Sequence, residues 1–416
     1  MIRRAVAAVV AALLVAGCQR AAEQPPVNPN RQSRATNPFL PVPVDETPDR
    51  INLLNFAHGA AIVSRTGEAS LLQSALAAID GDPASLWTSL PKQARQTFVA
   101  SLPARSRIER IGLRANRPPV RANRIEVETS IDGTTFTKLA TVTATNDRPL
   151  LINVPPTEAR YLRVTMDGEK PEADTALGSV YVQGAELEAA AVPSIAGCWS
   201  VNGNSALFAE RRGRAIGAIA TPAGAMRLDG GSNGRAYRFA WIRNNEFGVA
   251  LVSISPDGQH LSGEYWHEEP IPLFFAESWF GERRTCGTQL ADRGEVPAFF
   301  LRHSGRYPLF GLHFDASGTF DVANSMETLG GLAGFIRSVG AQPLRVVAHE
   351  FRNGDAAKNR AAAEREIAAV RATLQRGGID VTHVQFVAAG DANPREEPIT
   401  EAMRALYSSV DVEIQR

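Results

Sequence analysis

The stretch Arg124-Ile-Glu-Val-Glu-Thr-Ser130 is followed by Asp132-Gly133 and then by Phe136-Thr-Lys-Leu-Ala-Thr-Val142. Polar and apolar residues alternate in these runs, which is the pattern of β-strands with one buried face. Asp-Gly supplies the positive φ that a tight turn needs, so the two runs predict a β-hairpin. Similar short runs, separated by turn residues, fill the surrounding sequence. Residues 51–190 are therefore expected to form an all-β sandwich.

The composition limits the class of protein. A chain of 416 residues with 44% hydrophobic content is longer than one core usually serves, so we expect a multidomain protein. Its 44 Lys and Arg residues balance 44 Asp and Glu residues. This zero net charge argues against a nucleic-acid partner, which would need a basic face.

The N-terminus carries Arg3 and Arg4, then an apolar run that ends in Leu14-Val-Ala-Gly-Cys18. This pattern resembles a bacterial lipobox, and the resemblance implies that residues 1–17 are a signal peptide removed before a lipidated Cys18. An ordinary signal peptide with a chance cysteine is the alternative. Gln19, where inner-membrane retention would usually need Asp, implies a lipid anchor in the outer membrane, with the protein facing the periplasm. Residues 18–50 are polar and proline-rich, which predicts a tether.

Residues 51–190 carry several motifs of one family, in that family's order. They resemble the discoidin, or F5/8 type C, galactose-binding-like domain, which implies a β-sandwich with carbohydrate-binding members. The matching pieces are Asn55–Ala60, Ile79–Ser89, Ile108–Leu113, Ser130–Phe136 and Ala159–Val164.

Two sites are implied by this resemblance. In many members a loop matching Asp80, Asp82 and Ser85, together with a glutamate matching Glu186, holds a structural calcium through its oxygen atoms. A metal-free Asp-Gly turn is the alternative reading. In the sugar-binding members a loop arginine and asparagine bind hydroxyl groups, and the matching loop contains Arg117 and Asn123.

An aromatic platform for a sugar ring is missing beside Arg117 and Asn123 in the sequence. We interpret Trp87 as a packing residue rather than as that platform.

Residues 195–288 form a second β-rich segment, which predicts a small antiparallel barrel or meander. Cys198 and Cys286 bracket it, and in an oxidising compartment they are expected to form one disulfide. Two cysteines alone cannot complete a tetrahedral zinc site. Gly230-Gly-Ser-Asn-Gly234 matches the pattern of a hydrolase nucleophile, but the alternating run after it predicts a hairpin instead of the required helix.

Residues 297–416 change to a strand, helix, strand, helix, strand pattern, which predicts an α/β domain. The expected strands are Leu309–Phe314, Leu344–His349, Val384–Ala388 and Val410–Ile414, with helices around 326–339 and 363–374. This segment resembles the OmpA-like peptidoglycan-associated domain, with matches in His313-Phe-Asp315, Val346–His349, Gly354, Asn359 and Val412–Ile414.

The OmpA-like resemblance fails at the ligand positions. Family members hold diaminopimelate with an aspartate and an arginine, and the register places Phe351 and Glu366 at these two positions. Phe351 offers no acceptor to the ligand's ammonium group, and Glu366 would repel its carboxylate. We therefore expect this domain not to bind peptidoglycan in the family's way.

Together these features predict a non-enzymatic, lipid-anchored protein of the cell envelope that contacts a glycan or a protein partner. One alternative is an accessory or catalytic component of envelope glycan processing. Another is a peptidoglycan-binding OmpA-family lipoprotein. Glycoside hydrolysis would need two carboxylates at one cleft, and nothing in the sequence singles out such a pair.

Overall fold

The computed structural model describes residues 51–414, except for 83, 116–121, 144–148, 169, 171–173, 270–275, 288–289, 291–293, 316–318, 341, 352–354 and 393–399. The chain from Phe39 to Arg416 is one compact unit. Among the described residues, no helix is both long and apolar enough to cross a membrane. The predictions for Cys18, for residues 1–50, for Arg117 and for Gly354 lie outside the described residues.

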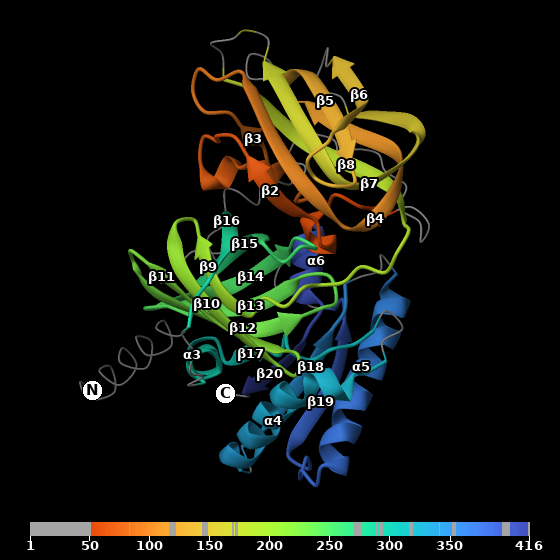
Figure 1. The fold of residues 1–416 in the computed structure, drawn as a ribbon. Helices are drawn as coiled ribbons and strands as arrows, with labels where there is room; N and C mark the ends of the chain where they lie inside the picture. Colours follow the sequence, from red (N-terminus) through yellow and green to blue (C-terminus); the bar gives the residue numbers. More distant parts are fainter. Residues whose placement is uncertain are drawn as a thin grey trace, which may run out of the picture. The chain divides into compact units, whose positions relative to one another are not determined.

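The first β region is built on two long strands, β4 (Arg95–Ala115) and β7 (Leu150–Gly168), shown in Figure 1. They pair along most of their length, but their register shifts between Ser101 and Ser106. This shift lets each strand serve two layers, and the sheet order is β1-β8-β4-β7-β5-β6. The other strands are β1 (Ile51–Asn52), β2 (Ala61–Arg65), β3 (Trp87–Thr88), β5 (Ala122–Ser130), β6 (Thr137–Thr143) and β8 (Ala176–Glu186), with short 3-10 helices η1 (Phe56–His58), η2 (Leu71–Gln73) and η3 (Ala75–Ala78).

The predicted hairpin of this region is present, because β5 and β6 pair in antiparallel fashion. Ile125 and Val127 of β5 are fully buried, whereas Arg124 is exposed, as the alternation requires. The two layers enclose an apolar core that includes Leu54, Phe98 and Leu162.

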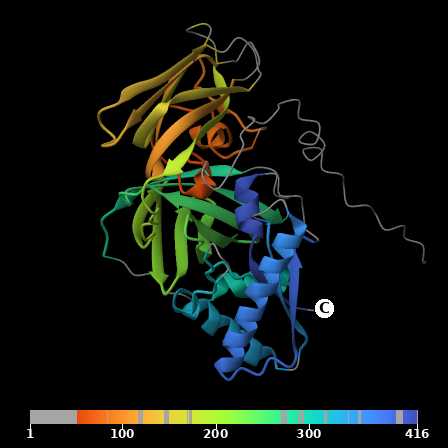
Figure 2. The same ribbon diagram turned by 90° about the vertical axis from the view of Figure 1, so that its right-hand side faces the viewer.

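The second β region is a closed antiparallel barrel in the order β10-β11-β12-β13-β14-β15-β16-β9 (Figures 1 and 2). The prediction of a small barrel is confirmed. Gly230–Gly234 forms the end of β12 and the turn to β13, so it is a hairpin and not a nucleophile elbow. Aromatic side chains fill the interior, among them Trp199, Phe239 and Trp241. The strands are β9 (Gly197–Val201), β10 (Asn204–Arg211), β11 (Arg214–Thr221), β12 (Gly224–Ser232), β13 (Tyr237–Arg243), β14 (Glu246–Ile254), β15 (His260–Glu269) and β16 (Glu277–Arg284).

The C-terminal region is an α/β layer with strand order β17-β20-β18-β19, in which only β18 and β19 run parallel. Helix α5 packs against β18 and β19, and α4 lies beside α5. Gly377-Gly378 ends α5, as the sequence predicts. The elements are α3 (Glu295–His303), β17 (Arg306–Pro308), α4 (Val322–Val339), β18 (Leu344–His349), α5 (Ala356–Arg376), β19 (Val384–Gly390), α6 (Glu401–Tyr407) and β20 (Val410–Ile414).

One predicted strand of this region is wrong. Leu309–Phe314 is not a strand, because the chain leaves the sheet after Pro308 and turns, with the Leu312 amide bonded to the Leu309 carbonyl. A Cβ on Gly311 would lie only 2.2 Å from Thr328 Oγ1 of α4, so the turn brings the backbone tightly against that helix. The strand at this edge is Arg306–Pro308 instead, paired with β20.

Candidate functional site

The loop after η3 gathers three of the four predicted calcium ligands. Gly81 has a φ of +78°, which folds the loop back on itself. Asp80 Oδ1 accepts hydrogen bonds from the Asp82 amide at 2.8 Å and from the Ser85 hydroxyl at 2.9 Å. Asp82 in turn accepts the Ala84 amide at 2.7 Å. The loop is therefore held by its own side chains.

Asp80 lies in an acidic environment, since its side chain is buried with 6% of the residue exposed. Burial raises its pKa well above the ordinary value, and the negative charges of Glu264 and Asp82 raise it further. Glu264 is a buried residue of barrel strand β15, far away in sequence. This contribution from the barrel could not be read from the loop sequence.

Glu186, the fourth predicted ligand, is engaged elsewhere. Its two carboxylate oxygens accept hydrogen bonds from Arg235, one of them at 3.0 Å from Arg235 Nη2. The described residues contain no group of three or more His, Cys, Asp or Glu side chains arranged to hold a metal. The structure thus brings Asp80, Asp82 and Ser85 together and separates Glu186 from them, so the predicted ligand set fits calcium only in part.

Of the predicted sugar-binding residues Arg117 and Asn123, only Asn123 is among the described residues. Asn123 is half-buried near the start of β5, at a position where the pairing of β5 with β7 shifts between Ala122 and Arg124. A bulge of this kind re-aims a side chain at the edge of a sheet. Asn123 therefore lies at an irregular strand end.

Trp87 is a packing residue, as predicted. It is buried, and its ring makes an edge contact with Phe98 at 5.1 Å between centroids. The sequence reading missed two half-buried rings near the β5–β6 turn, Phe136 and Tyr161. The Arg163 guanidinium covers Phe136 at 4.4 Å and also pairs with Glu128 through two hydrogen bonds of 2.5 and 2.6 Å. The covered face of Phe136 is thus occupied by the protein itself.

Phe351 and Glu366, which the sequence predicted at lost peptidoglycan-binding positions, are both buried in the C-terminal region. Phe351 is 8% exposed and packs against Tyr407, with 6.1 Å between ring centroids. Glu366 is 3% exposed on the inner face of α5. Both side chains belong to the interior of the domain.

A buried ion pair occupies the adjoining sheet. Asp411 of β20 is fully buried, and Arg306 Nε of β17 lies 3.0 Å from its Oδ2. The Ser409 hydroxyl donates to Asp411 Oδ1 at 2.7 Å. His349 lies 3.8 Å from the same carboxylate, and burial lowers the pKa of its imidazole. Asp411 thus links β17, β20 and β18.

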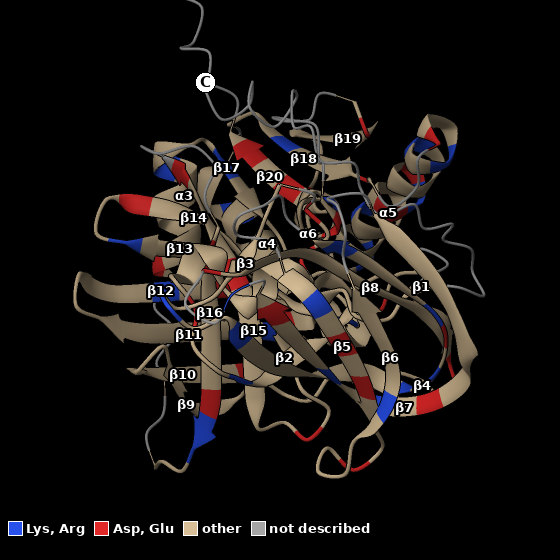
Figure 3. Ribbon diagram, turned by 90° about the horizontal axis from the view of Figure 1, so that it is seen from above, with Lys and Arg blue, Asp and Glu red and all other residues tan. Residues whose placement is uncertain are grey.

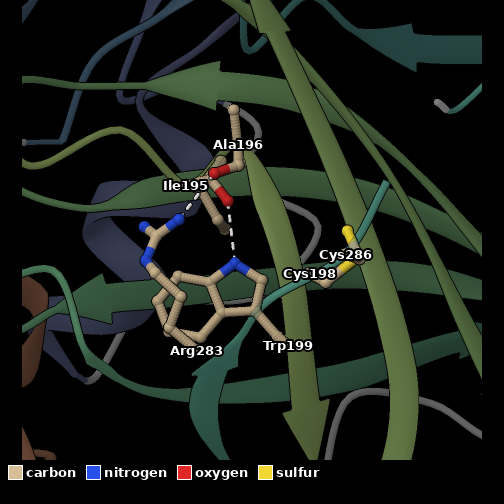
Figure 4. The surroundings of a disulfide bond; sticks show 6 residues. All are labelled: Ile195, Ala196, Cys198, Trp199, Arg283 and Cys286. Carbon is tan, nitrogen blue, oxygen red and sulfur yellow. Dashed lines mark hydrogen bonds between the residues drawn. A yellow bond between two sulfur atoms is a disulfide. The ribbon is translucent and has the colours of Figure 1, made fainter. Parts of the chain in front are cut away.

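Cys198 and Cys286 form the predicted disulfide (Figure 4). Cys198 pairs with Arg284 in the register between β9 and β16, the first and last strands of the barrel. The bond therefore lies at the seam where the barrel closes. Beside it, Arg283 lies 4.3 Å above the Trp199 ring and donates to the Ala196 carbonyl at 2.6 Å. The Trp199 indole donates to the Ile195 carbonyl at 2.8 Å.

The first β region matches a known protein family. Residues 61–179 match the F5/8 type C domain. The match confirms the family predicted for this segment, and it includes both the Asp80 loop and Asn123. No curated protein matches the chain.

Several solved structures align over about a third of this chain. The C-terminal domain of a chitobiase from Bacteroides fragilis is 22% identical and aligns over 34% of this chain and all of its own, with a TM-score of 0.29. A chitosan-binding module of a chitosanase/glucanase from Paenibacillus sp. IK-5 is 22% identical over 32% of this chain and 99% of its own, with a TM-score of 0.28. A family 32 carbohydrate-binding module from Streptococcus pneumoniae EndoD is 14% identical over 32% and 98%, with a TM-score of 0.27.

Proposed function

We propose that this protein is a non-enzymatic component of the bacterial cell envelope that binds a glycan through its F5/8 type C domain. The family match over residues 61–179 carries the proposal, because this family includes carbohydrate-binding modules. The bulged start of β5, which carries Asn123, supports the proposal. Any calcium in this domain would be held by Asp80, Asp82 and Ser85 without Glu186.

The proposed setting is the periplasmic face of the outer membrane. Leu14–Cys18 supports a lipid anchor at Cys18, and the proline-rich residues 18–50 support a tether between the anchor and the domains. In the view of Figure 3, basic and acidic residues are interspersed rather than gathered into separate bands. This pattern suits a neutral glycan or an envelope protein better than nucleic acid.

For the C-terminal region we propose an OmpA-like fold that serves packing or protein contacts. The burial of Phe351 and Glu366 supports the loss of the family's diaminopimelate grip. The two residues are only 8% and 3% exposed. Peptidoglycan is for this reason not the proposed glycan partner of this domain.

The test is a glycan array probed with the full-length protein, displayed multivalently so that weak binding is detected. We expect Asn123→Ala and Arg117→Ala each to lower retention about five- to tenfold, since each removes a group that binds hydroxyls. Arg105→Ala is the matched control for charge, because Arg105 is an exposed arginine in surface ion pairs on β4. A blank array, or equal losses in all three variants, would contradict the proposal.

A further inference from the structure

A cleft of about 640 Å³ lies where the three regions of the compact unit meet. Its wall includes η1 of the first β region, the turn between β12 and β13 of the barrel, and parts of α4 and α6. Helix α6 contacts both η1 and β14 (Figure 1). The described residues that line the cleft all lie outside residues 61–179, so it is separate from the segment that matches the F5/8 type C domain.

Polar contacts join the walls of this cleft. Arg238 of β13 is 6% exposed and donates to the Ser408 carbonyl, just after α6, at 2.5 Å. His58 Nε2 of η1 lies 3.7 Å from Glu401 Oε2 of α6. The barrel and η1 are thus both attached to α6, which fixes the cleft between them.

His313 offers the cleft a hydrogen-bond acceptor. Its Nε2 lies 2.9 Å from the Gly213 carbonyl oxygen, which can only accept, so Nε2 carries the proton. Burial lowers the pKa of the imidazole, which keeps the ring neutral at pH 7. Its Nδ1 therefore keeps a lone pair. This atom is not buried, and no described residue donates to it.

Asn233 offers the cleft a hydrogen-bond donor. Its Oδ1 accepts the backbone amides of Arg235 at 2.9 Å and of Ala236 at 2.8 Å, which fixes the side chain in the turn between β12 and β13. Its NH₂ group is not buried and donates to none of the described residues. Two N–H bonds of fixed orientation therefore remain for a ligand.

A carboxylate and a guanidinium complete the polar set. Asp321, exposed at the start of α4, accepts the backbone amide of Asn324 at 3.1 Å and its side-chain NH₂ at 2.8 Å. These bonds lower the pKa of Asp321, so it is a charged acceptor with lone pairs to spare. Arg404 of α6 is partly exposed and pairs with Glu401 through one nitrogen, which leaves further N–H groups as donors.

The cleft also contains an aromatic ring, that of Phe314. Phe314 is half-buried and lines the cleft. Phe320, whose ring centroid is 5.0 Å away across an antiparallel bridge, does not line it. A ring beside fixed donors and acceptors suits a ligand that has both an apolar C–H face and polar groups.

The charges of the lining residues argue against a charged ligand. The lining side chains include three carboxylates and three guanidinium groups, on Asp315, Asp321, Glu401, Arg235, Arg238 and Arg404. The carboxylates would repel an anion and the guanidinium groups a cation. A purely apolar ligand would remove water from these groups without pairing them. A hydroxyl group both donates and accepts, so it can bond to either kind.

From these observations we propose that the cleft binds an uncharged saccharide. Its hydroxyl groups donate to His313 Nδ1 and the Asp321 carboxylate. Other hydroxyl oxygens accept from Asn233 and Arg404, while the sugar ring packs on Phe314. This is a second binding site, independent of the glycan surface proposed for the F5/8 type C domain.

The first test measures binding of triacetylchitotriose and of maltotriose to the full-length protein by titration calorimetry. Asn233→Asp keeps the acceptor that holds the turn and replaces the NH₂ donor with an oxygen. We expect it to weaken binding roughly three- to tenfold. Asn245→Asp is the matched control, because it makes the same change at the exposed turn between β13 and β14, away from the cleft. Its affinity should equal that of the wild type.

The second test removes the ring. Phe314→Leu should weaken saccharide binding about three- to tenfold, because the aromatic surface under the sugar is lost. Phe320→Leu is the control: both rings pack on the same apolar cluster, so the two variants lose similar stability. Only the ring of Phe314 lines the cleft, so Phe320→Leu should keep the wild-type affinity.

Asn123→Ala separates this proposal from glycan binding by the F5/8 type C domain. Binding that persists in Asn123→Ala and falls in Asn233→Asp supports the cleft. Binding that is lost in Asn123→Ala and unchanged in Asn233→Asp overturns the cleft site and leaves the proposed function intact. No binding of either trisaccharide, equal losses in Phe314→Leu and Phe320→Leu, or tighter binding of the anionic sialyllactose or of an uncharged alanine peptide would each overturn it as well.

Discussion

The F5/8 type C domain contains two Asp-Gly turns that look alike in sequence and differ in electrostatics. Gly81 and Gly133 have nearly the same φ, +78° and +75°. Asp132 is exposed and accepts hydrogen bonds from the Thr134 and Thr135 amides, which lower its pKa. Asp80 is buried near Glu264, and its pKa is raised.

The difference shows that the dipeptide determines the turn and the surroundings determine the chemistry. An exposed carboxylate that accepts amide protons is stabilised in its charged form. A buried carboxylate beside another acid is stabilised as the neutral acid, unless a cation is supplied. Asp411 is a third case, because it is fully buried but has Arg306 beside it.

The largest loss of stability is expected on removal of the Asp411 carboxylate, which lies beside Arg306. Asp411→Asn removes the nearest countercharge of the half-buried Arg306, and we expect a loss of up to about 3 kcal/mol in the free energy of unfolding. Hydrogen exchange of β17 and β20 measures the loss locally, since a multidomain chain need not unfold in one step. Glu413→Gln is the control: it makes the same charge change on β20 in a partly exposed pair with Arg345. Its loss should stay near 0–1 kcal/mol, and equal effects of the two variants would refute the argument.

A smaller loss of stability is expected on reduction of the disulfide in the barrel, the region that contributes Glu264 to the surroundings of Asp80. Reduction of Cys198–Cys286 should destabilise the barrel by about 2–4 kcal/mol, because the bond closes a long loop at the seam. Cys286 is exposed, so a reductant can reach it. Exchange should increase in β9 and β16 and stay unchanged in β4 and β7. A Cys198→Ser, Cys286→Ser protein must show no further change on reduction, and equal exchange before and after reduction of the wild type would contradict this prediction.

The sequence predicted those features that depend on local pattern. Alternation and Asp132-Gly133 were sufficient for the β5–β6 hairpin, and glycine and apolar spacing were sufficient for α4 and α5. The strand expected at Leu309–Phe314 failed because its apolar residues line a turn packed on α4 and the barrel. A run of apolar residues indicates burial, but it does not indicate which partner buries them.

The site residues were harder to predict because their partners are distant in sequence. Glu186 was expected at the Asp80 loop, yet Arg235 of the barrel binds it. Glu264 was not expected near that loop, although it contributes to the raised pKa of Asp80. Both interactions connect the F5/8 type C domain with barrel residues, and no local motif encodes them.

The smallest effect tests the two turns directly, through the pH dependence of the unfolding midpoint, Tm. The unfolded chain releases the Asp80 proton near the ordinary pKa of 3.8, whereas the folded chain holds it to higher pH. The folded state then binds more protons in this window, so stability falls as pH rises from about 4 through the folded pKa. Asp80→Asn keeps the acceptor oxygen and removes the titration. Its Tm should therefore exceed that of the wild type by a margin that grows above pH 4.

Asp132→Asn should lower the Tm relative to the wild type, whereas Asp80→Asn should raise it. The pKa of Asp132 is lowered in the folded state, so its charged form adds stability above the unfolded pKa, and that stability is lost as pH falls through the folded pKa. The variant should melt below the wild type at neutral pH, and the two should converge in acid. Shifts of the same sign in both variants would show that burial near Glu264 does not set the behaviour of Asp80. A Tm that rises with calcium in the wild type but not in Asp80→Asn would show that a cation, rather than a proton, neutralises the buried loop.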